Sequence, residues 1–263
     1  MIGVTGSHGF IASHLIEKLG EENVIRLNRE GFVPEKLEGI IDLAAFGNLS
    51  GHKSDPRETY LANLSRIIEL THQINRTNTF EYLIYISTSS VQLPHQTYYS
   101  ASKKACEEFL KVFSRDNDFP VAIIRPFTII GIGEHEEHLI PTLIRSALTD
   151  ESMPFVSKPH HDFLDVRDFV EAIIKVRDNI KDMRGEVFEV GSGISLSNLE
   201  IKNRVEKLTD TKIKVNEVES MRKYDTTEWI SNNEKIARLG WKPKYDNIDT
   251  LTEMINDYAR KNS

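Results

Sequence analysis

The sequence predicts an α/β protein built around a doubly wound parallel sheet, with a smaller second lobe toward the carboxyl end of the chain. Short apolar runs alternate with amphipathic stretches over about the first 130 residues, which is the pattern of buried parallel strands joined by crossover helices. A turn with two glycines follows the first apolar run and leads into the first amphipathic stretch. At 263 residues, the chain can form one large domain of this class and a small second lobe.

Five apolar runs are expected to form the parallel strands, and they are residues 1–5, 24–28, 40–44, 82–87 and 121–125. Helices are expected between them at 11–19, 56–75 and 97–116. Asp55 before Pro56 supplies a cap and a first-turn proline for the second of these helices. The stretch from Asn28 to Ile40 is too short for both a helix and a strand, so one βα unit is predicted to be abbreviated.

After Arg125 the pattern is less regular, and shorter elements are expected. A loop is predicted at 131–137, and an exposed connection at 155–161. The expected helices are 139–149, 166–176, 198–208, 234–239 and 250–260, and the expected strands are 187–190 and 213–218.

Charge and composition exclude several classes of protein. The formal net charge is −7 and lysine and arginine form no cluster, so no nucleic-acid partner is expected. No apolar run approaches the roughly 20 residues that span a bilayer, and the chain begins directly with a strand, so a cytoplasmic protein without a signal peptide or membrane partner is expected. Cys106 is the only cysteine, so no internal disulfide is expected. His135 and His138 are three residues apart rather than the four of a zincin motif, and no third ligand is apparent, so no metal site is expected.

The turn after the first strand has the residues of a dinucleotide site. It and the start of the next helix run Gly6, Ser7, His8, Gly9, Phe10, Ile11 and Ala12. The glycines let the backbone approach a pyrophosphate, which sits on the helix N-terminus, and Ala12 is small enough to replace the third glycine of the Rossmann fingerprint. A plain glycine turn is the alternative, and the position directly after the first strand disfavours it.

The end of the second strand points to the choice of cofactor. A dinucleotide site that prefers NAD commonly has an acid there for the adenosine ribose, whereas this chain has Asn28 and Arg29. Arg29 suits the 2′-phosphate of NADP, so NADP is expected and NAD is possible. A solvated arginine is the alternative.

Tyr99 and Lys103 stand four residues apart within the helix predicted at 97–116. Helical spacing places a phenol and an ammonium on one face. The ammonium favours the phenolate, so we expect it to lower the pKa of Tyr99 and to prepare the phenol for acid/base chemistry.

Taken together, several motifs resemble those of the extended short-chain dehydrogenase/reductases, and in particular the NAD(P)-dependent nucleotide-sugar epimerases and dehydratases. The motifs are TGSHGFI at 5–11, DLAA at 42–45, STSSV at 87–91, Tyr99 with Lys103, RPF at 125–127, HDFLDV at 161–166, FEVGSG at 188–193 and LGWKP at 239–243. The resemblance covers nearly the whole chain. It implies a Rossmann-like domain of 1–126 with 165–191, and a substrate-binding lobe of 127–164 with 192–263.

The resemblance also implies a role for particular residues. The hydroxyl of Thr88 would bind the reacting sugar oxygen, Tyr99 would exchange the proton, and Lys103 would bind the nicotinamide ribose. The residues implied in cofactor binding are Gly6, Ser7, His8, Gly9, Phe10, Ile11, Asn28, Arg29, Leu43, Ala44, Ala45, Asn63, Tyr99, Lys103, Pro126 and Phe127. Asn63 would organise the active-site helices, with a solvated asparagine as the alternative, and core packing is the alternative for Phe127.

Substrate binding is implied for Thr128, His161 and Arg222. Thr128 replaces the asparagine that often follows the RPF motif, and His161 replaces an arginine, so the identity of the sugar is left open. A surface histidine is the alternative for His161.

Ser89 and Ser90 occupy the places of the acid pair that dehydratases of this group use to eliminate water, so dehydration is disfavoured. Reduction of a nucleotide-linked 4-keto-6-deoxy sugar by NADPH, with Tyr99 as proton donor, is expected. The alternative is a 4-epimerase with tightly bound NAD, and a non-catalytic cofactor-sensing regulator is disfavoured because Thr88, Tyr99 and Lys103 are all retained. A homodimer is expected by analogy, through the helices at 56–75 and 97–116.

Overall fold

The computed structural model of the chain describes residues 1–27, 37–47, 55–77, 79–219, 223 and 225–262. The chain divides into two compact units. The first comprises Met1–Pro126, Val170–Val190 and Asn233–Trp241, and the second comprises Phe127–Phe169, Gly191–Asn232 and Lys242–Ser263. The sequence-based assignment of a dinucleotide-binding domain and a substrate-binding lobe, with its own boundaries, stays a prediction.

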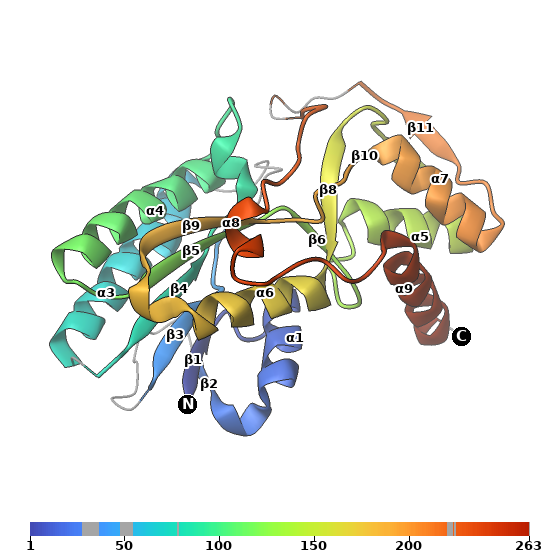
Figure 1. The fold of residues 1–263 in the computed structure, drawn as a ribbon. Coiled ribbons are helices and arrows are strands. Elements are labelled where there is room, and N and C mark those ends of the chain that lie inside the picture. The colour runs from blue at the N-terminus through green and yellow to red at the C-terminus, as the bar shows by residue number, and fades with distance from the viewer. Residues whose placement is uncertain (28–36, 48–54, 78, 220–222, 224, 263) are drawn as a thin grey trace. The chain divides into compact units, whose positions relative to one another are not determined.

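A six-stranded parallel sheet forms the centre of the first unit (Figure 1). Its order is β2-β1-β3-β4-β5-β9, and all five neighbouring pairs are parallel. The strands are β1 (Ile2–Thr5), β2 (Val24–Leu27), β3 (Gly39–Asp42), β4 (Tyr82–Ile86), β5 (Val121–Pro126) and β9 (Arg184–Val190). This arrangement confirms the predicted Rossmann-like fold. The prediction of an abbreviated βα unit falls on residues 28–36, which lie outside the described residues.

Helices cover both faces of the sheet. Figure 1 shows α3 and α4 on one face, and α1 and α6 on the other. The helices that contribute to the first unit are α1 (Phe10–Leu19), α2 (Pro56–Tyr60), α3 (Arg66–Thr77), α4 (Tyr98–Asp116), α6 (Val166–Asp178, which belongs to this unit from Val170 on) and α8 (Glu234–Ala237). The predicted cap is present, because the Asp55 carboxylate accepts from the amides of Arg57 and Glu58 at 2.7 and 3.0 Å.

Burial on both faces explains why the strands are apolar throughout. In β4, Leu83 and Tyr85 point to one face and Ile84 to the other, and all three are fully buried. Leu83 and Tyr85 belong to an apolar cluster with Leu70 of α3 and Leu110 of α4. The core therefore holds the ends of the strands in fixed register beneath the loops that follow them.

In its described residues, the second unit contains two small sheets and three long helices. One sheet has the order β10-β8-β6 and the other pairs β11 with β7. The strands are β6 (Thr128–Ile130), β7 (Met153–Phe155), β8 (His160–Asp165), β10 (Ser195–Ser197) and β11 (Val215–Glu217), and the helices are α5 (Leu139–Thr149), α7 (Asn198–Thr209) and α9 (Asn247–Lys261).

The exposed connection predicted at 155–161 is wrong. Phe155 ends β7 and is buried, and His160 begins β8. The polar start of β8 concealed the strand, because His160 and His161 pair with β10 rather than carrying an apolar pattern. Among the described residues, no helix has both the length and the apolar character of a membrane span.

Candidate active site

The glycine turn after β1 has the geometry of an anion cradle. Gly6 has φ +61°, and a Cβ there would lie only 2.9 Å from the amide nitrogen of Ala44, so only glycine fits. The Gly9 amide donates to the Gly6 carbonyl at 2.8 Å, and no side chain caps the first turn of α1. The free amides of α1 and the close backbone approach fit the pyrophosphate of a dinucleotide.

A tether from β2 holds this turn, and the sequence did not reveal it. Arg26 donates to the carbonyl of Ser7 at 2.7 Å and forms an ion pair with Glu21 at 2.6 Å. Ser7 is buried, whereas His8 is exposed. Arg26 therefore fixes the turn from the side of the neighbouring strand.

A buried charge network fixes the loop after β3. Asp42 is fully buried and accepts from Thr5 Oγ1 at 2.6 Å and from both terminal nitrogens of Arg66 at 2.5 and 2.8 Å. Thr5 Oγ1 accepts from the Ala44 amide at 3.0 Å, and Arg66 donates to the Ala44 carbonyl at 2.9 Å. Burial opposes ionisation of Asp42, but Arg66 and Thr5 together lower its pKa below the ordinary value.

This network places Ala44 directly beside Gly6, and both lie at the carboxyl ends of adjacent parallel strands. That edge is where ligands bind in open α/β sheets. Sequence reasoning selected Leu43, Ala44 and Ala45 but missed Arg66, because Arg66 is 24 residues from its carboxylate partner.

Thr88 follows β4 and caps the short 3₁₀ turn Ser89–Gln92. Its Oγ1 accepts from the Ser90 amide at 3.2 Å and lies 3.0 Å from Ser90 Oγ. Ser89 and Ser90 are buried. The loop therefore presents neutral hydroxyls, and no carboxylate, at the two positions after Thr88.

Tyr99 and Lys103 lie one turn apart on α4, which begins with a capping box between Thr97 and Ser100. Lys103 is 1% exposed. Its Nζ donates to the Ile86 carbonyl at 2.6 Å and lies 4.2 Å from the centroid of the Tyr85 ring. Burial lowers the pKa of Lys103 to about 8, although the Asp42 carboxylate acts in the opposite direction.

The expected lowering of the Tyr99 pKa is wrong for this geometry. Burial raises the pKa of Tyr99 to about 12. The ammonium of Lys103 is held by the Ile86 carbonyl and the Tyr85 ring, so it does not offset the burial of the phenol. Tyr99 is therefore a neutral phenol at neutral pH.

Asn63 connects the loop after β3 to the helix that carries Tyr99. It is 1% exposed and lies in a π-helical turn, Leu61–Ser65, between α2 and α3. The side-chain oxygen of Asn63 accepts a hydrogen bond from the backbone amide of Phe46 at 2.8 Å. Its side-chain nitrogen donates to the Phe46 carbonyl and to Ser102 Oγ, both at 2.9 Å. Ser102 in turn donates to the Tyr99 carbonyl at 2.8 Å. The alternative of a solvated asparagine is excluded.

A second buried carboxylate anchors α4 to the sheet. Glu107 is fully buried and accepts from Ser87 Oγ at 2.5 Å and from Arg125 at 2.6 and 2.9 Å. The helix of Tyr99 and the strand that leads to Thr88 are thereby tied together, because Ser87 directly precedes Thr88.

The remaining predicted residues lie elsewhere. Pro126 ends β5, whereas Phe127, Thr128 and His161 belong to the second unit. There, Thr128 Oγ1 lies 3.4 Å from His161 Nδ1, and the His161 ring packs against the buried Trp229 with centroids 5.4 Å apart. Trp229 was missed, because its segment carries no periodic pattern.

Asn28, Arg29 and Arg222 lie outside the described residues. Within the described part of the chain, no group of three or more histidine, cysteine, aspartate or glutamate side chains is placed to hold a metal ion.

Comparison with known proteins agrees with this geometry. Residues 2–191 match the model of the NAD dependent epimerase/dehydratase family. The chain is 26% identical to a UDP-glucose 4-epimerase of Lacticaseibacillus casei, over 96% of this chain and 94% of that protein. It is 25% identical to a dTDP-glucose 4,6-dehydratase of Haemophilus influenzae, over 96% of this chain and 80% of that protein.

A similar fold occurs in MoeE5, solved in complex with UDP-glucose and NAD. The two structures superpose with a TM-score of 0.90 and 22% identity, over 100% of this chain and 99% of that chain.

Proposed function

The chain belongs to the NAD-dependent epimerase/dehydratase family, and on that premise we propose that it is a 4-epimerase of a nucleotide-diphosphate sugar. The observation that carries the proposal is the set Thr88, Tyr99 and Lys103, combined with hydroxyls at the two positions after Thr88. Relatives named as UDP-glucose 4-epimerases and a neighbour solved with UDP-glucose and NAD support the substrate class and the cofactor.

The proposed roles follow from the chemistry of each group. Thr88 donates its hydroxyl hydrogen to the sugar oxygen that reacts, since the Ser90 amide already occupies one lone pair of Oγ1. Because burial keeps the phenol neutral in the free chain, binding of the positively charged nicotinamide would have to ionise it, and the Tyr99 phenolate would then take the proton from that oxygen and return it. Lys103, one helical turn from Tyr99 on α4, supplies a buried positive charge and a donor for the nicotinamide ribose. NAD, when bound, supplies the hydride acceptor that an epimerase needs within one turnover.

Dehydration is not proposed, because elimination of water needs an acid and a base beside the sugar. Ser89 and Ser90 are buried hydroxyls and neither ionises near neutral pH. The epimerase reaction needs no further acid or base, because one phenol serves both half-reactions.

A reductase of a nucleotide-linked 4-keto-6-deoxy sugar is the second candidate. Arg29 favours it, because it follows the last residue of β2 by two positions in the sequence, where an arginine suits the 2′-phosphate of NADP. The neutral phenol of Tyr99, whose pKa burial raises to about 12, is also suited to donate a proton as hydride arrives.

The experiment that tests the proposal is conversion of UDP-glucose by the NAD-loaded protein, with the two C4 epimers resolved by chromatography. We expect the galacto epimer to form, and Tyr99→Phe to lower the rate by about 10²-fold or more, because the proton-transfer group is lost. Tyr98→Phe is the matched control, since Tyr98 is exposed on the same helix. Loss of NADPH absorbance with a 4-keto sugar, together with no epimer from any UDP-hexose, would favour the reductase instead.

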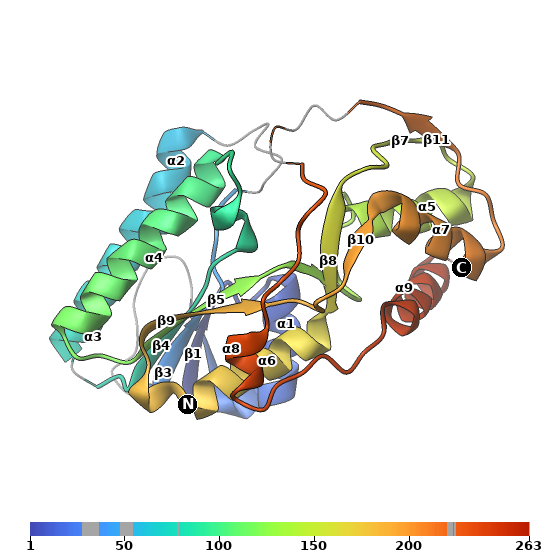
Figure 2. The ribbon, with the colours of Figure 1, turned by 45° about the horizontal axis from the view of Figure 1, so that its top comes forward.

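We further propose that Thr128, His161 and Arg222 contact the substrate, and that two copies of the chain associate through α2, α3 and α4. Figure 2 shows α2 and α3 alongside α4. Large apolar side chains are exposed on this layer, and they are Leu61 of the π-helical turn between α2 and α3 (52%), Ile68 of α3 (44%) and Val112 of α4 (47%). Helices that cover one face of a sheet and still display apolar side chains fit an interface with a second copy.

A further inference from the structure

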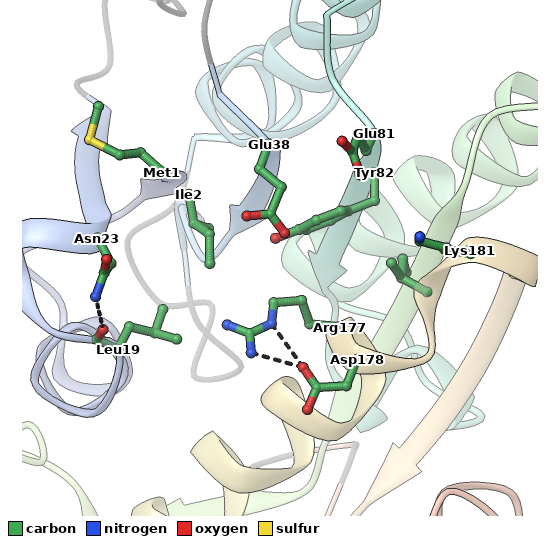
Figure 3. A pocket seen from close by; sticks show the side chains of 11 residues that line it. Met1, Ile2, Leu19, Asn23, Glu38, Glu81, Tyr82, Arg177, Asp178 and Lys181 are labelled. Atoms are coloured by element: carbon green, nitrogen blue, oxygen red, sulfur yellow. Dashed lines mark hydrogen bonds and ion pairs between the residues drawn. The ribbon is translucent and has the colours of Figure 1, made fainter.

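A pocket lies at the amino-terminal edge of the parallel sheet, the opposite end of the strands from Thr88 (Figure 3). Its volume is about 450 Å³, within the range of small-molecule sites. The lining comes from the starts of β1 and β4, from Glu38 before β3, and from the ends of α1 and α6. All of these residues belong to the first unit.

Tyr82 forms the floor of this pocket with a polar group that has no partner. Its side chain is 2% exposed, and its hydroxyl makes no hydrogen bond with any described residue. Figure 3 shows Tyr82, Glu38 and Arg177 around the same pocket, and, besides burial, the charges of Glu38 and Arg177 both act on the pKa of the Tyr82 hydroxyl, in opposite directions. An unpartnered hydroxyl at such a site costs stability unless a ligand or water bonds to it.

Gly39 fixes the position of the Tyr82 ring. A Cβ at Gly39 would lie 2.4 to 2.5 Å from three atoms of the ring, so the ring packs closely against the backbone of β3. The packing of the ring against β3 therefore fixes the position of the Tyr82 hydroxyl.

The charges around Tyr82 favour a cation. Arg177 is occupied by Asp178, to which its Nε and Nη2 donate at 3.1 and 2.8 Å. The carboxylates of Glu38 and Glu81 have no ion pair with a described residue, and the other charged groups of the described lining are the Lys181 side chain and the amino group of Met1. Burial and the Glu38 carboxylate both raise the pKa of Tyr82, so the hydroxyl stays neutral and can accept a hydrogen bond.

Two helix ends add to this negative potential. α1 ends at Leu19 and α6 ends at Asp178, and both residues line the pocket. The C-terminus of a helix carries a partial negative charge and carbonyl groups without helical partners. Ile2, Leu19 and Ile180 add apolar surface that suits an alkyl chain, and Met1 and Asn23 complete the described lining.

We propose that this pocket is a second ligand site, separate from the nucleotide-sugar site, and that it binds a small primary alkylammonium ion. The ammonium group bridges the Glu38 carboxylate and the Tyr82 hydroxyl, and the alkyl chain lies against Ile2, Leu19 and Ile180. Such a ligand supplies the missing partner of Tyr82 and neutralises a carboxylate in one step.

The test is calorimetric titration of the full chain with putrescine and with n-butylammonium, at neutral pH and low salt. Saturable binding with a dissociation constant of about 1 mM or tighter is expected. Tyr82→Phe removes only the hydroxyl, and Glu38→Gln removes only the charge, and each should weaken binding about tenfold, the worth of one charge-assisted hydrogen bond. Glu228→Gln, at an exposed carboxylate of the second unit, is the control and should leave binding unchanged.

Three results would overturn the proposal. They are the absence of saturable binding by either amine, unchanged affinity in both pocket variants, and tighter binding of succinate than of putrescine. The last would show that Lys181 and Arg177 select an anion. Circular dichroism of each variant shows whether a loss of binding comes from unfolding. If Tyr82→Phe does not fold, the affinity of Glu38→Gln alone tests the proposal.

Discussion

Lys103 shows how one buried residue couples stability to chemistry. The residue is 1% exposed, and its amine donates a hydrogen bond to the Ile86 carbonyl at 2.6 Å. Burial lowers the pKa of Lys103 in the folded state to about 8, from about 10.5 for a lysine in water. At pH below about 8 the lysine is protonated in both the folded and the unfolded chain, and burying its charge lowers the free energy of unfolding. As the pH rises toward 10.5 the folded chain loses this proton first, so the destabilisation disappears.

Replacement of Lys103 by methionine should remove this pH dependence. We expect the free energy of unfolding of the unmodified chain to rise between pH 8 and 10.5, by at most about 3 kcal/mol more than that of Lys103→Met. Urea unfolding at several pH values measures the difference. Lys104→Met, at the exposed neighbouring lysine, should keep the profile of the unmodified chain. Parallel profiles for the chain and Lys103→Met would contradict the assignment of a buried, perturbed amine.

At the scale of the element, the π-helical turn Leu61–Ser65 explains how the helices of the candidate site are joined. The wider turn carries Asn63, which bonds to both backbone groups of Phe46 and to Ser102. π-turns inside α-helices occur frequently at functional sites. The sequence predicted one continuous helix over 56–75, because a single inserted residue leaves no trace in an apolar pattern.

Truncation of Asn63 should be costly. Asn63→Ala leaves the amide and carbonyl of Phe46 without partners, so we expect a loss of about 2–4 kcal/mol in the free energy of unfolding. Asn75→Ala on α3 is the matched control, because the Asn75 amide bonds only to Asn117 at the surface, and it should cost about 0.5 kcal/mol or less. Equal effects of the two substitutions in urea unfolding would show that Asn63 does not link the loop to α4.

For the whole molecule, the spacing of apolar residues was enough to predict a strand or helix wherever that element is buried on one or both faces. The five amino-terminal strands were predicted within a residue or two over their described parts, because each is a short run buried by helices. β8 was missed because it opens with His160 and His161, whose place in a sheet depends on a strand far along the chain. Partners such as Asp42 and Arg66 were likewise hidden, since sequence spacing says nothing of which side chains meet across a fold.

The proposed association of two copies is tested at this same scale. Ile68→Glu combined with Val112→Glu places two charges on the exposed faces of α3 and α4, so we expect a dimer in light scattering to become a monomer. Leu148→Glu, on α5 of the second unit, is the control, since Leu148 is 41% exposed outside these helices. A monomer before any substitution would contradict the proposed interface.

Retention of deuterium tests the central claim most directly, which is that Thr88, Tyr99 and Lys103 serve hydride transfer at C4 of a nucleotide-linked hexose. UDP-glucose deuterated at C4 is incubated with the NAD-loaded protein, and the product is analysed by mass spectrometry. The proposed epimerase yields UDP-galactose with the label still at C4, and Tyr99→Phe yields almost none. Solvent hydrogen at C4, or equal yields from the chain and Tyr99→Phe, would contradict the account.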